Sequence, residues 1–342
     1  MKKLTGVCIG AGYFSQFHFD AWQRIENVEI AAICDHQLAK AQTVCDTYGF
    51  KKAYDDVVTM LETEKPDFVD IITPPETHLE LCKLAIANGI DIICQKPLAP
   101  TYGESVQIAE MIKSSGVRMM VHENFRFMPW YREIKKLLEQ NTIGDKIQTI
   151  QLRMRMGDGW QDDAYMNRQP YFRKMDRLLI YETGIHFIDV FSFLGGNIKS
   201  VYAKLRTLNP NIKGEDFAWV NFDFENGTLG FLDASRYNEN TAEDPRLTFG
   251  SVLIDGPKGS IRLYDDGTIT VQPLGKKETK HTYHFENKNF SGDCVFATQS
   301  HFIERLCDNK PFETEVSKYL KNIEVQDAIY RSNDEKSPVN IA

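Results

Sequence analysis

Apolar and polar residues alternate in blocks over the first third of this chain of 342 residues. Short apolar runs, which we expect to form strands, are separated by segments with the periodicity of amphipathic helices. Strands that are apolar throughout and separated by helices of roughly 10–15 residues indicate a parallel sheet covered on both faces. The predicted strands are 4–10, 29–34, 68–72, 90–94 and 118–122. The predicted helices are 13–25, 35–48, 76–87 and 101–115.

The pattern changes after a predicted helix at residues 130–140. Strand-like segments follow, and Asn226-Gly227 and Asp266-Gly267 are turn sequences typical of β-hairpins. These segments are 146–156, 198–208, 217–224, 228–235, 246–254, 259–264 and 268–272, with helix patterns returning at 295–306 and 319–332. We therefore predict an α/β protein with a parallel-sheet domain in residues 1–123 and a second α+β domain in residues 124–342. The second domain is expected to be built on a large, mostly antiparallel sheet.

Composition and charge narrow the possible function classes. The formal net charge of −8 argues against a nucleic-acid partner, because phosphate binding requires a basic surface. No apolar run approaches the roughly 18–20 residues that span a bilayer, and the N-terminus lacks the apolar region of a signal peptide. We therefore expect a cytoplasmic protein with no membrane partner. The seven cysteines include no C-x-x-C pair, so we expect reduced thiols and no metal site.

The joint between the first strand and the first helix carries a dinucleotide-binding pattern, Gly10-Ala11-Gly12-Tyr13-Phe14-Ser15. In the G-x-G-x-x-G/A fingerprint, the first glycine makes a tight turn, the second admits the pyrophosphate and the third lets the helix pack on the strand. Asp35 ends the second strand, where a carboxylate accepts the ribose hydroxyls of NAD and repels the 2′-phosphate of NADP. The sequence thus predicts an N-terminal Rossmann domain that binds NAD rather than NADP. Asp35 alone could instead cap the next helix.

Three further joints follow strands of the same predicted sheet, and they contain Thr73-Pro74, Lys96 and Asn124. Ligands of open α/β sheets bind outside the carboxyl ends of the strands, so we expect these residues to converge. The expected cofactor contacts are Gly10, Gly12, Tyr13, Phe14, Asp35, Thr73, Pro74, His78, Gln95, Lys96 and Asn124.

One apolar helix, predicted over residues 181–194, carries ionisable side chains. Glu182, His186 and Asp189 have the spacing i, i+4 and i+7, which places them on one helix face. A histidine between two acids is suited to holding or exchanging a proton. The alternative is a core histidine whose hydrogen bonds are satisfied by its neighbours.

These motifs, in this order, resemble the glucose–fructose oxidoreductase / inositol dehydrogenase / MocA-like (Gfo/Idh/MocA) family over nearly the whole chain. The specific elements are the E-K-P signature, here Gln95-Lys96-Pro97, and the later G-x-H-x-x-D helix, here Gly184 to Asp189. The resemblance implies catalysis by Lys96 and His186, with Glu182 as the acid one turn earlier, and a cis peptide bond before Pro97. It also implies an oligomer, expected to be a homodimer or homotetramer, formed through the wide sheet. The chain departs from the family pattern at Ser15 and Gln95.

The resemblance further implies NAD(P)-dependent oxidation of a CH–OH group in a small sugar or polyol. We expect a free aldose oxidised to its lactone, in the manner of the family's aldose dehydrogenases, including those for branched pentoses such as apiose. A cyclitol or a nucleotide sugar is the alternative substrate. A non-catalytic NAD-binding regulatory protein is disfavoured because both Lys96 and His186 are retained. The candidate substrate contacts are Arg153, Arg155, Trp160, Tyr165, Arg168, Tyr181 and Asp189.

Overall fold

The computed structural model describes residues 3–341, which form two compact units. The first unit contains the chain up to Asn124 together with Val295–Lys321, and the second contains Phe125–Cys294 and the chain from Asn322 onward. The segment Val295–Lys321 therefore returns to the first unit, although the sequence-based division placed it in the second domain. Among the described residues, no helix combines the length and apolar character needed to cross a membrane.

The first unit is built on a six-stranded parallel sheet with the strand order β3-β2-β1-β4-β5-β6, the order of a Rossmann fold. Its strands are β1 (Leu4–Ile9), β2 (Val28–Cys34), β3 (Ala53–Tyr54), β4 (Phe68–Ile71), β5 (Asp91–Gln95) and β6 (Met119–His122). Its helices are α1 (Ser15–Arg24), α2 (Leu38–Tyr48), α3 (Val57–Glu64), α4 (His78–Ala87), α5 (Tyr102–Ser115) and α8 (Cys294–Cys307).

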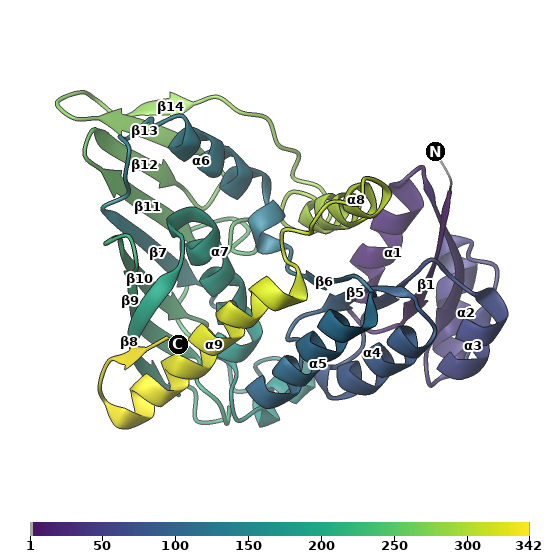
Figure 1. Cartoon of the computed structure of the whole chain (residues 1–342). Helices are drawn as coiled ribbons and strands as arrows, with labels where there is room; N and C mark the ends of the chain where they lie inside the picture. Colours follow the sequence, from purple (N-terminus) through teal and green to yellow (C-terminus); the bar gives the residue numbers. More distant parts are fainter. Residues whose placement is uncertain (1–2, 342) are drawn as a thin grey trace. The chain divides into compact units, whose positions relative to one another are not determined.

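One core of this unit lies between the sheet and three of its helices. Side chains of α1, α2 and α8, including Phe19, Ala41 and Phe302, pack with strand residues such as Cys8 and Ile33 in one buried cluster. Helices α4 and α5 lie side by side on the other face of the sheet (Figure 1). Both faces of the sheet are therefore covered, which explains why its strands are apolar throughout.

The element boundaries follow local sequence signals. Helix α5 begins with a reciprocal capping box, in which the side chain of Thr101 accepts from the backbone of Glu104 and the Glu104 carboxylate accepts from the backbone of Thr101. Helix α2 ends at Gly49, which takes the left-handed conformation with φ 72°. Strand β3 and helix α3 were not predicted from the sequence.

The second unit is built on a nine-stranded sheet with the order β14-β13-β12-β11-β7-β10-β9-β8-β15. Every neighbouring pair is antiparallel except β10 and β7, which confirms the mostly antiparallel prediction. The strands are β7 (Thr149–Arg155), β8 (Ile198–Arg206), β9 (Phe217–Phe224), β10 (Leu229–Ser235), β11 (Ser251–Gly256), β12 (Gly259–Leu263), β13 (Ile269–Pro273), β14 (Thr279–His281) and β15 (Val339–Asn340). The helices are α6 (Pro129–Glu139), α7 (Ile185–Gly195) and α9 (Val316–Glu335). The start of α9, up to Lys321, belongs to the first unit.

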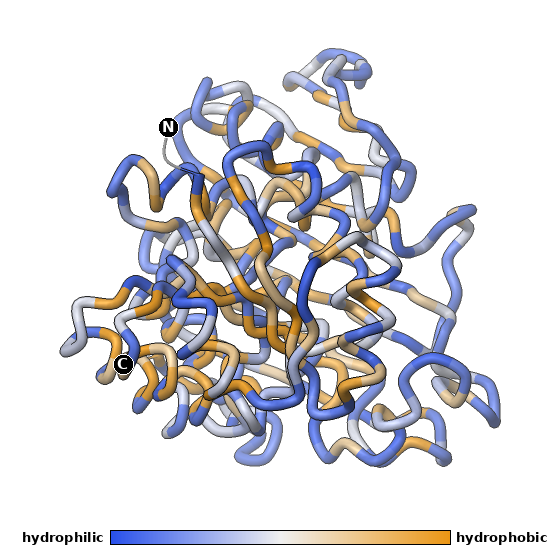
Figure 2. The backbone as a smooth tube through the Cα atoms, turned by 90° about the vertical axis from the view of Figure 1, so that its right-hand side faces the viewer, coloured by the Kyte–Doolittle hydropathy of each residue, from blue (hydrophilic) through white to orange (hydrophobic). Residues whose placement is uncertain are grey.

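Alternating burial defines two different faces of this large sheet. In β9, the residues Ala218, Val220 and Phe222 are buried, whereas Trp219 and Asn221 between them are only partly buried. The apolar stretches follow strands and helices, and most connecting loops are hydrophilic (Figure 2). The buried face packs against α7, where the ring of Phe191 lies 4.7 Å from that of Phe222.

Candidate active site

The turn after β1 has the shape that a dinucleotide pyrophosphate requires. Gly10 has φ 106°, and a Cβ added there would lie 3.0 Å from the carbonyl carbon of Ile72, so a larger residue does not fit. A Cβ added at Gly12 would have no heavy atom within 4 Å, which leaves open space beside the start of α1. Ser15 replaces the third glycine without conflict, because its buried hydroxyl donates to the carbonyl oxygen of Gly12 at 2.7 Å.

Asp35 joins this turn to the end of β2. Its Oδ2 accepts from the backbone N–H of Ala11 at 2.9 Å, and its Oδ1 accepts from that of Gln37 at 2.9 Å. Helix α2 begins at Leu38 after Gln37, so Asp35 is not its N-cap. A carboxylate has about four acceptor positions, so Asp35 retains capacity for ribose hydroxyls. The residues of this edge therefore fit NAD.

The loop after β4 is held by a buried histidine. In the ring of His78, Nε2 lies 2.8 Å from the carbonyl oxygen of Thr73, and Nδ1 lies 3.0 Å from that of Leu98. Burial lowers the pKa of His78, and the hydrogen bonds to these carbonyl oxygens oppose that shift only in part. His78 is fully buried, so it links the loops after β4 and β5 rather than presenting its ring to a ligand.

Lys96 follows β5 at the same carboxyl edge, and its peptide bond to Pro97 is cis, as the resemblance implied. Asn124 follows β6 in the neighbouring position. Tyr13 is half exposed beside the glycine turn, while Phe14 packs edge-on against the ring of His18. The structure thus places Gly10, Asp35, Thr73, Lys96 and Asn124 after strands of one parallel sheet.

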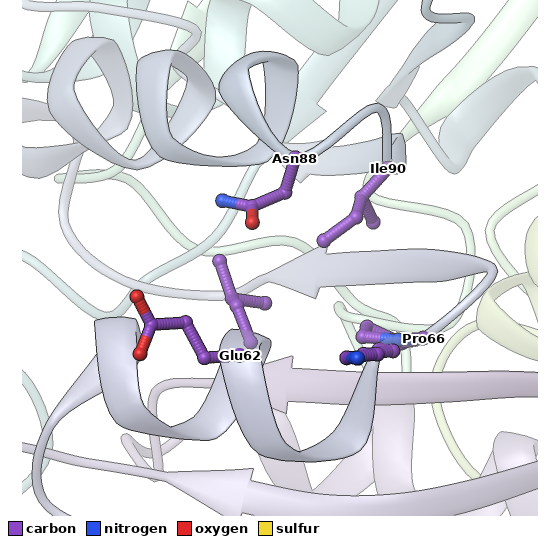
Figure 3. A pocket seen from close by; sticks show the side chains of 6 residues that line it. Glu62, Pro66, Asn88 and Ile90 are labelled. Carbon is purple, nitrogen blue, oxygen red and sulfur yellow. The ribbon is translucent and has the colours of Figure 1, made fainter.

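A pocket of this unit lies at the opposite, amino-terminal edge of the sheet. Glu62, Pro66, Asn88 and Ile90 surround it (Figure 3), with Leu61 and Lys65 also in its lining. These residues end α3 and α4 and precede β4 and β5, so the pocket does not belong to the candidate cofactor site.

In the second unit, the helix predicted over residues 181–194 is two elements. A π-helical turn, Leu179–Gly184, precedes α7, which starts at Ile185. A π turn has i→i+5 hydrogen bonds, so the 3.6-residue spacing does not hold from Glu182 to His186. The expected common face of Glu182, His186 and Asp189 is therefore not maintained.

His186 and Asp189 have different surroundings. The imidazole of His186 is 5% exposed and stacks on the ring of Phe125, with centroids 3.9 Å apart and planes at 4°. The carboxylate of Asp189 is fully buried, accepts from Nε and Nη2 of Arg126 at 2.7 and 2.6 Å, and accepts from Asn322 at 2.7 Å. We therefore correct the expectation for Asp189: it anchors α7 and does not contact substrate.

A buried arginine that the sequence analysis missed lies beside Glu182. Arg236 donates to the hydroxyls of Thr183 and Tyr165 and to the carboxylate of Asp158 at 2.7–3.1 Å, and its Nη1 lies 3.6 Å from Glu182. Burial lowers the pKa of this guanidinium, but Asp158, Tyr165 and Glu182 more than offset it, so the pKa lies above its ordinary value. Burial also raises the pKa of Tyr165 to about 12. Arg236 follows β10 directly, and a charge at the end of an apolar strand was the available signal.

The remaining substrate candidates separate into two groups. Arg168 lies 3.3 Å from Asp158 and so belongs to the cluster of Tyr165 and Arg236. Arg153 and Arg155 both pair with Asp233 and alternate along β7 with buried residues that face α7. Because successive strand side chains point to opposite faces, these two arginines lie on the face of β7 away from its buried residues, and their contact with substrate stays a prediction.

Two further candidates lie at the surface or donate through their backbone. Trp160 is 46% exposed and donates its indole N–H to Glu239 at 3.1 Å. Tyr181, in the π turn, donates its backbone N–H to the hydroxyl of Tyr330 at 3.1 Å.

A Rossmann unit with a glycine turn and an acid after β2 is typical of a dinucleotide-binding domain. Residues 4–123 match the family described as "Oxidoreductase family, NAD-binding Rossmann fold", and residues 131–262 match the GFO/IDH/MocA C-terminal domain. The chain therefore belongs to the Gfo/Idh/MocA oxidoreductase family, and NAD is its cofactor.

Named relatives and a solved structure agree with this assignment. The chain is 30% identical to D-apiose dehydrogenase of Rhizobium rhizogenes, over 97% of this chain and 96% of the relative. It is 26% identical to D-glucoside 3-dehydrogenase of Escherichia coli, over 68% of this chain and 70% of the relative. An oxidoreductase from Agrobacterium radiobacter, solved with NAD+, L-tartaric acid and magnesium, superposes with a TM-score of 0.92 at 29% identity, covering 99% of each chain.

Proposed function

We propose that the protein transfers a hydride between a carbinol carbon of a sugar and NAD, with an aldose and its lactone as the substrate pair. The observation that carries this proposal is Lys96, placed at the end of β5 in a sheet whose other strand ends carry the glycine turn and Asp35. The similarity to D-apiose dehydrogenase over almost the whole chain supports the choice of a sugar. A cyclitol is the alternative substrate.

Protein residues would accept the proton of the reacting hydroxyl, and the cofactor would accept the hydride. When bound, NAD supplies the nicotinamide ring that accepts or returns the hydride. His186 would remove the proton of the reacting hydroxyl at an imidazole nitrogen, because its ring is held in one orientation against Phe125. Lys96 would donate a hydrogen bond to the same oxygen and stabilise the negative charge that develops there.

The polar cluster around Asp158 would position the acidic partner of this chemistry. Glu182 accepts from the hydroxyl of Thr183 at 2.6 Å, and that hydroxyl in turn accepts from Arg236 at 2.8 Å. Nη1 of Arg236 lies 3.6 Å from the carboxylate of Glu182. A carboxylate fixed in this way could accept a hydrogen bond from a sugar hydroxyl or from His186.

A panel of aldoses and cyclitols, followed at the absorbance of NADH, tests the proposed reaction. Lys96→Ala and His186→Ala should each lower kcat by about 10²–10⁴-fold, the range typical of positioned acid–base groups, with a modest loss of affinity for NAD. His281→Ala is the matched control, because His281 lies in the same unit but pairs with Glu133 near the end of the sheet. Near-normal turnover of the His186 variant would contradict the assignment.

The same panel separates the alternatives. A protein that binds NAD but forms NADH with no sugar would be a non-catalytic binding protein. Turnover that requires a second, carbonyl-containing sugar would instead show a closed redox cycle with retained cofactor.

We also propose a cytoplasmic homodimer or homotetramer. Six of the seven cysteines are buried free thiols, which fits a reducing compartment. The outer face of the nine-stranded sheet carries partly buried aromatic side chains, which fits a contact between subunits.

A further inference from the structure

A buried polar cluster lies beneath Lys96 in the first unit. Its members are His18 on α1, Asp70 on β4, Gln95 on β5 and His122 on β6, and all four are buried. Gln95 stands where the family signature has glutamate, and the proposed catalysis assigns no role to its side chain. The contacts of this cluster show what an amide supplies there that a carboxylate would not.

The orientation of the Gln95 amide is fixed by the backbone. The N–H of Lys96 donates to Oε1 of Gln95 at 3.0 Å. A backbone N–H is only a donor, so the oxygen of the amide must face it and the NH₂ group must point the other way. This contact excludes the flipped amide, although oxygen and nitrogen have nearly the same shape.

The position of the NH₂ group then determines which ring nitrogen of His18 carries the proton. Nε2 of Gln95 lies 2.8 Å from Nε2 of His18 and 3.3 Å from Nδ1 of His122. Both hydrogens of the Gln95 NH₂ group are donors, so these two ring nitrogens must be acceptors. The proton of His18 is therefore on Nδ1, which lies 2.8 Å from Oδ2 of Asp70.

The other groups around His18 are consistent with a neutral ring. The rings of His18 and His122 stack with centroids 4.2 Å apart, where two positive charges would repel each other. Oδ2 of Asp70, which faces Nδ1 of His18, also accepts from the indole N–H of Trp22 at 2.7 Å. Burial, reinforced by the charge of Asp70, raises the pKa of Cys8, so Cys8 remains an uncharged thiol.

We propose that Gln95 is a positioning residue that fixes the backbone of Lys96 and at the same time holds His18 as a neutral ring protonated on Nδ1. This role rests on the proposed function of Lys96. A glutamate in place of Gln95 could still accept from the N–H of Lys96, but it has no hydrogen for Nε2 of His18. The ring would have to take up a second proton or exchange tautomers, and the anchoring of Lys96 would become dependent on pH.

The tautomer is tested directly by ¹⁵N NMR of the histidine side chains in the full-length protein. His18→Gln identifies the signals of His18 by their loss. The expected result is a His18 ring that carries a proton on Nδ1 and none on Nε2 at neutral pH. A proton on Nε2, or a doubly protonated ring at neutral pH, would overturn the proposal. This measurement needs no substrate, so it remains decisive even if Lys96 proves dispensable for turnover.

The link to Lys96 is tested by kinetics of two variants. Gln95→Leu removes the acceptor of the Lys96 N–H and should lower kcat by about 10-fold while the KM for NAD changes little. Gln95→Glu should restore most of that loss and add an ionisation to the pH profile of kcat/KM that the unchanged protein lacks. Cys94→Ala is the matched control, because this buried neighbour on β5 points to the opposite face of the sheet and contacts Cys82.

The outcomes separate positioning from mere packing. Equal loss in the leucine and glutamate variants, with profiles of unchanged shape, would show that Gln95 only fills space and would overturn the proposal. Full activity of Lys96→Ala would instead overturn the proposed function, whatever the state of His18.

Discussion

Several candidate site residues of this protein lie directly after strands. Gly10, Asp35 and Lys96 were predicted correctly as strand-end positions, because each follows a recognisable apolar run. Arg236 has the same placement after β10, but its partners Asp158 and Tyr165 are about 70 or more residues away in the sequence, as expected for a contact that only tertiary packing creates. The sequence predicted positions relative to strands, and it could not predict pairings between distant segments.

His78 provides a pH-dependent prediction at this scale. Burial lowers its pKa in the folded state from the ordinary value of 6.5, so the unfolded chain binds the proton more readily. The contribution of the neutral ring to stability is complete above about pH 6.5 and is lost as the pH falls through the lowered pKa. We expect the melting temperature of His78→Gln to be lower than that of the unchanged protein at pH 7.5, and the difference to shrink toward pH 5.5.

His36→Gln is the control for this titration, since His36 is an exposed histidine of the same unit. Its melting temperature should follow that of the unchanged protein at every pH. A difference for His78→Gln that stays constant with pH would show that His78 contributes only packing.

Among the elements, the π turn before α7 shows where local sequence rules end. An apolar segment with a glycine stop predicts a helix, but nothing in the pattern of residues 179–195 distinguishes i→i+5 from i→i+4 hydrogen bonds. The turn is set by distant groups: Glu215 accepts from the N–H groups of Leu178 and Ile180, and Gln326 donates to the carbonyl oxygen of Ile180. Helices with unusual turns are often functional, and this one presents Glu182.

Helix α3 was missed for a different reason. It is short, and it begins with Val57-Val58-Thr59, residues that favour strands. The side chain of Asp56 accepts from the backbone N–H of Thr59 at 2.8 Å and starts the helix there. A single N-cap thus outweighs the unfavourable helix propensities of three residues. Hydrophobic periodicity does not reveal such a cap.

Glu215 accepts from two backbone N–H groups at the π turn before α7. Removing it should affect activity as well as stability. Glu215→Ala leaves two buried N–H groups without their acceptor, which costs roughly 1–3 kcal/mol for each group. We expect a lower free energy of unfolding in urea and, at temperatures where the variant is fully folded, a lower kcat because Glu182 loses its fixed position. Glu225→Ala is the control, since this exposed acid of the same unit accepts from Asn197. An unchanged kcat in folded Glu215→Ala would separate the π turn from catalysis.

For the molecule as a whole, the sequence predicted the fold class and the two sheets but not the complete path of the chain. The predicted Rossmann sheet and mostly antiparallel second sheet are confirmed, as are the family and the cofactor. The return of Val295–Lys321 to the first unit was not predicted, because it depends on Phe302 and Phe312 packing with strand residues more than 150 positions earlier. Hydrophobic periodicity identifies a helix, but it does not specify which hydrophobic core the helix packs against.

The outer face of the nine-stranded sheet leads to a prediction about assembly. Tyr202, Trp219 and Phe231 stand on neighbouring strands β8, β9 and β10, are only partly buried, and contact one another edge to face. Contiguous aromatic side chains on an open sheet face are typical of subunit contacts. Phe231→Lys places a charge in the middle of this cluster, so the mass measured by light scattering should fall from that of a dimer or tetramer to that of a smaller species. Leu274→Lys, at an exposed hairpin of the same sheet, should leave the mass unchanged, and an unchanged mass for both variants would exclude this face as the subunit contact.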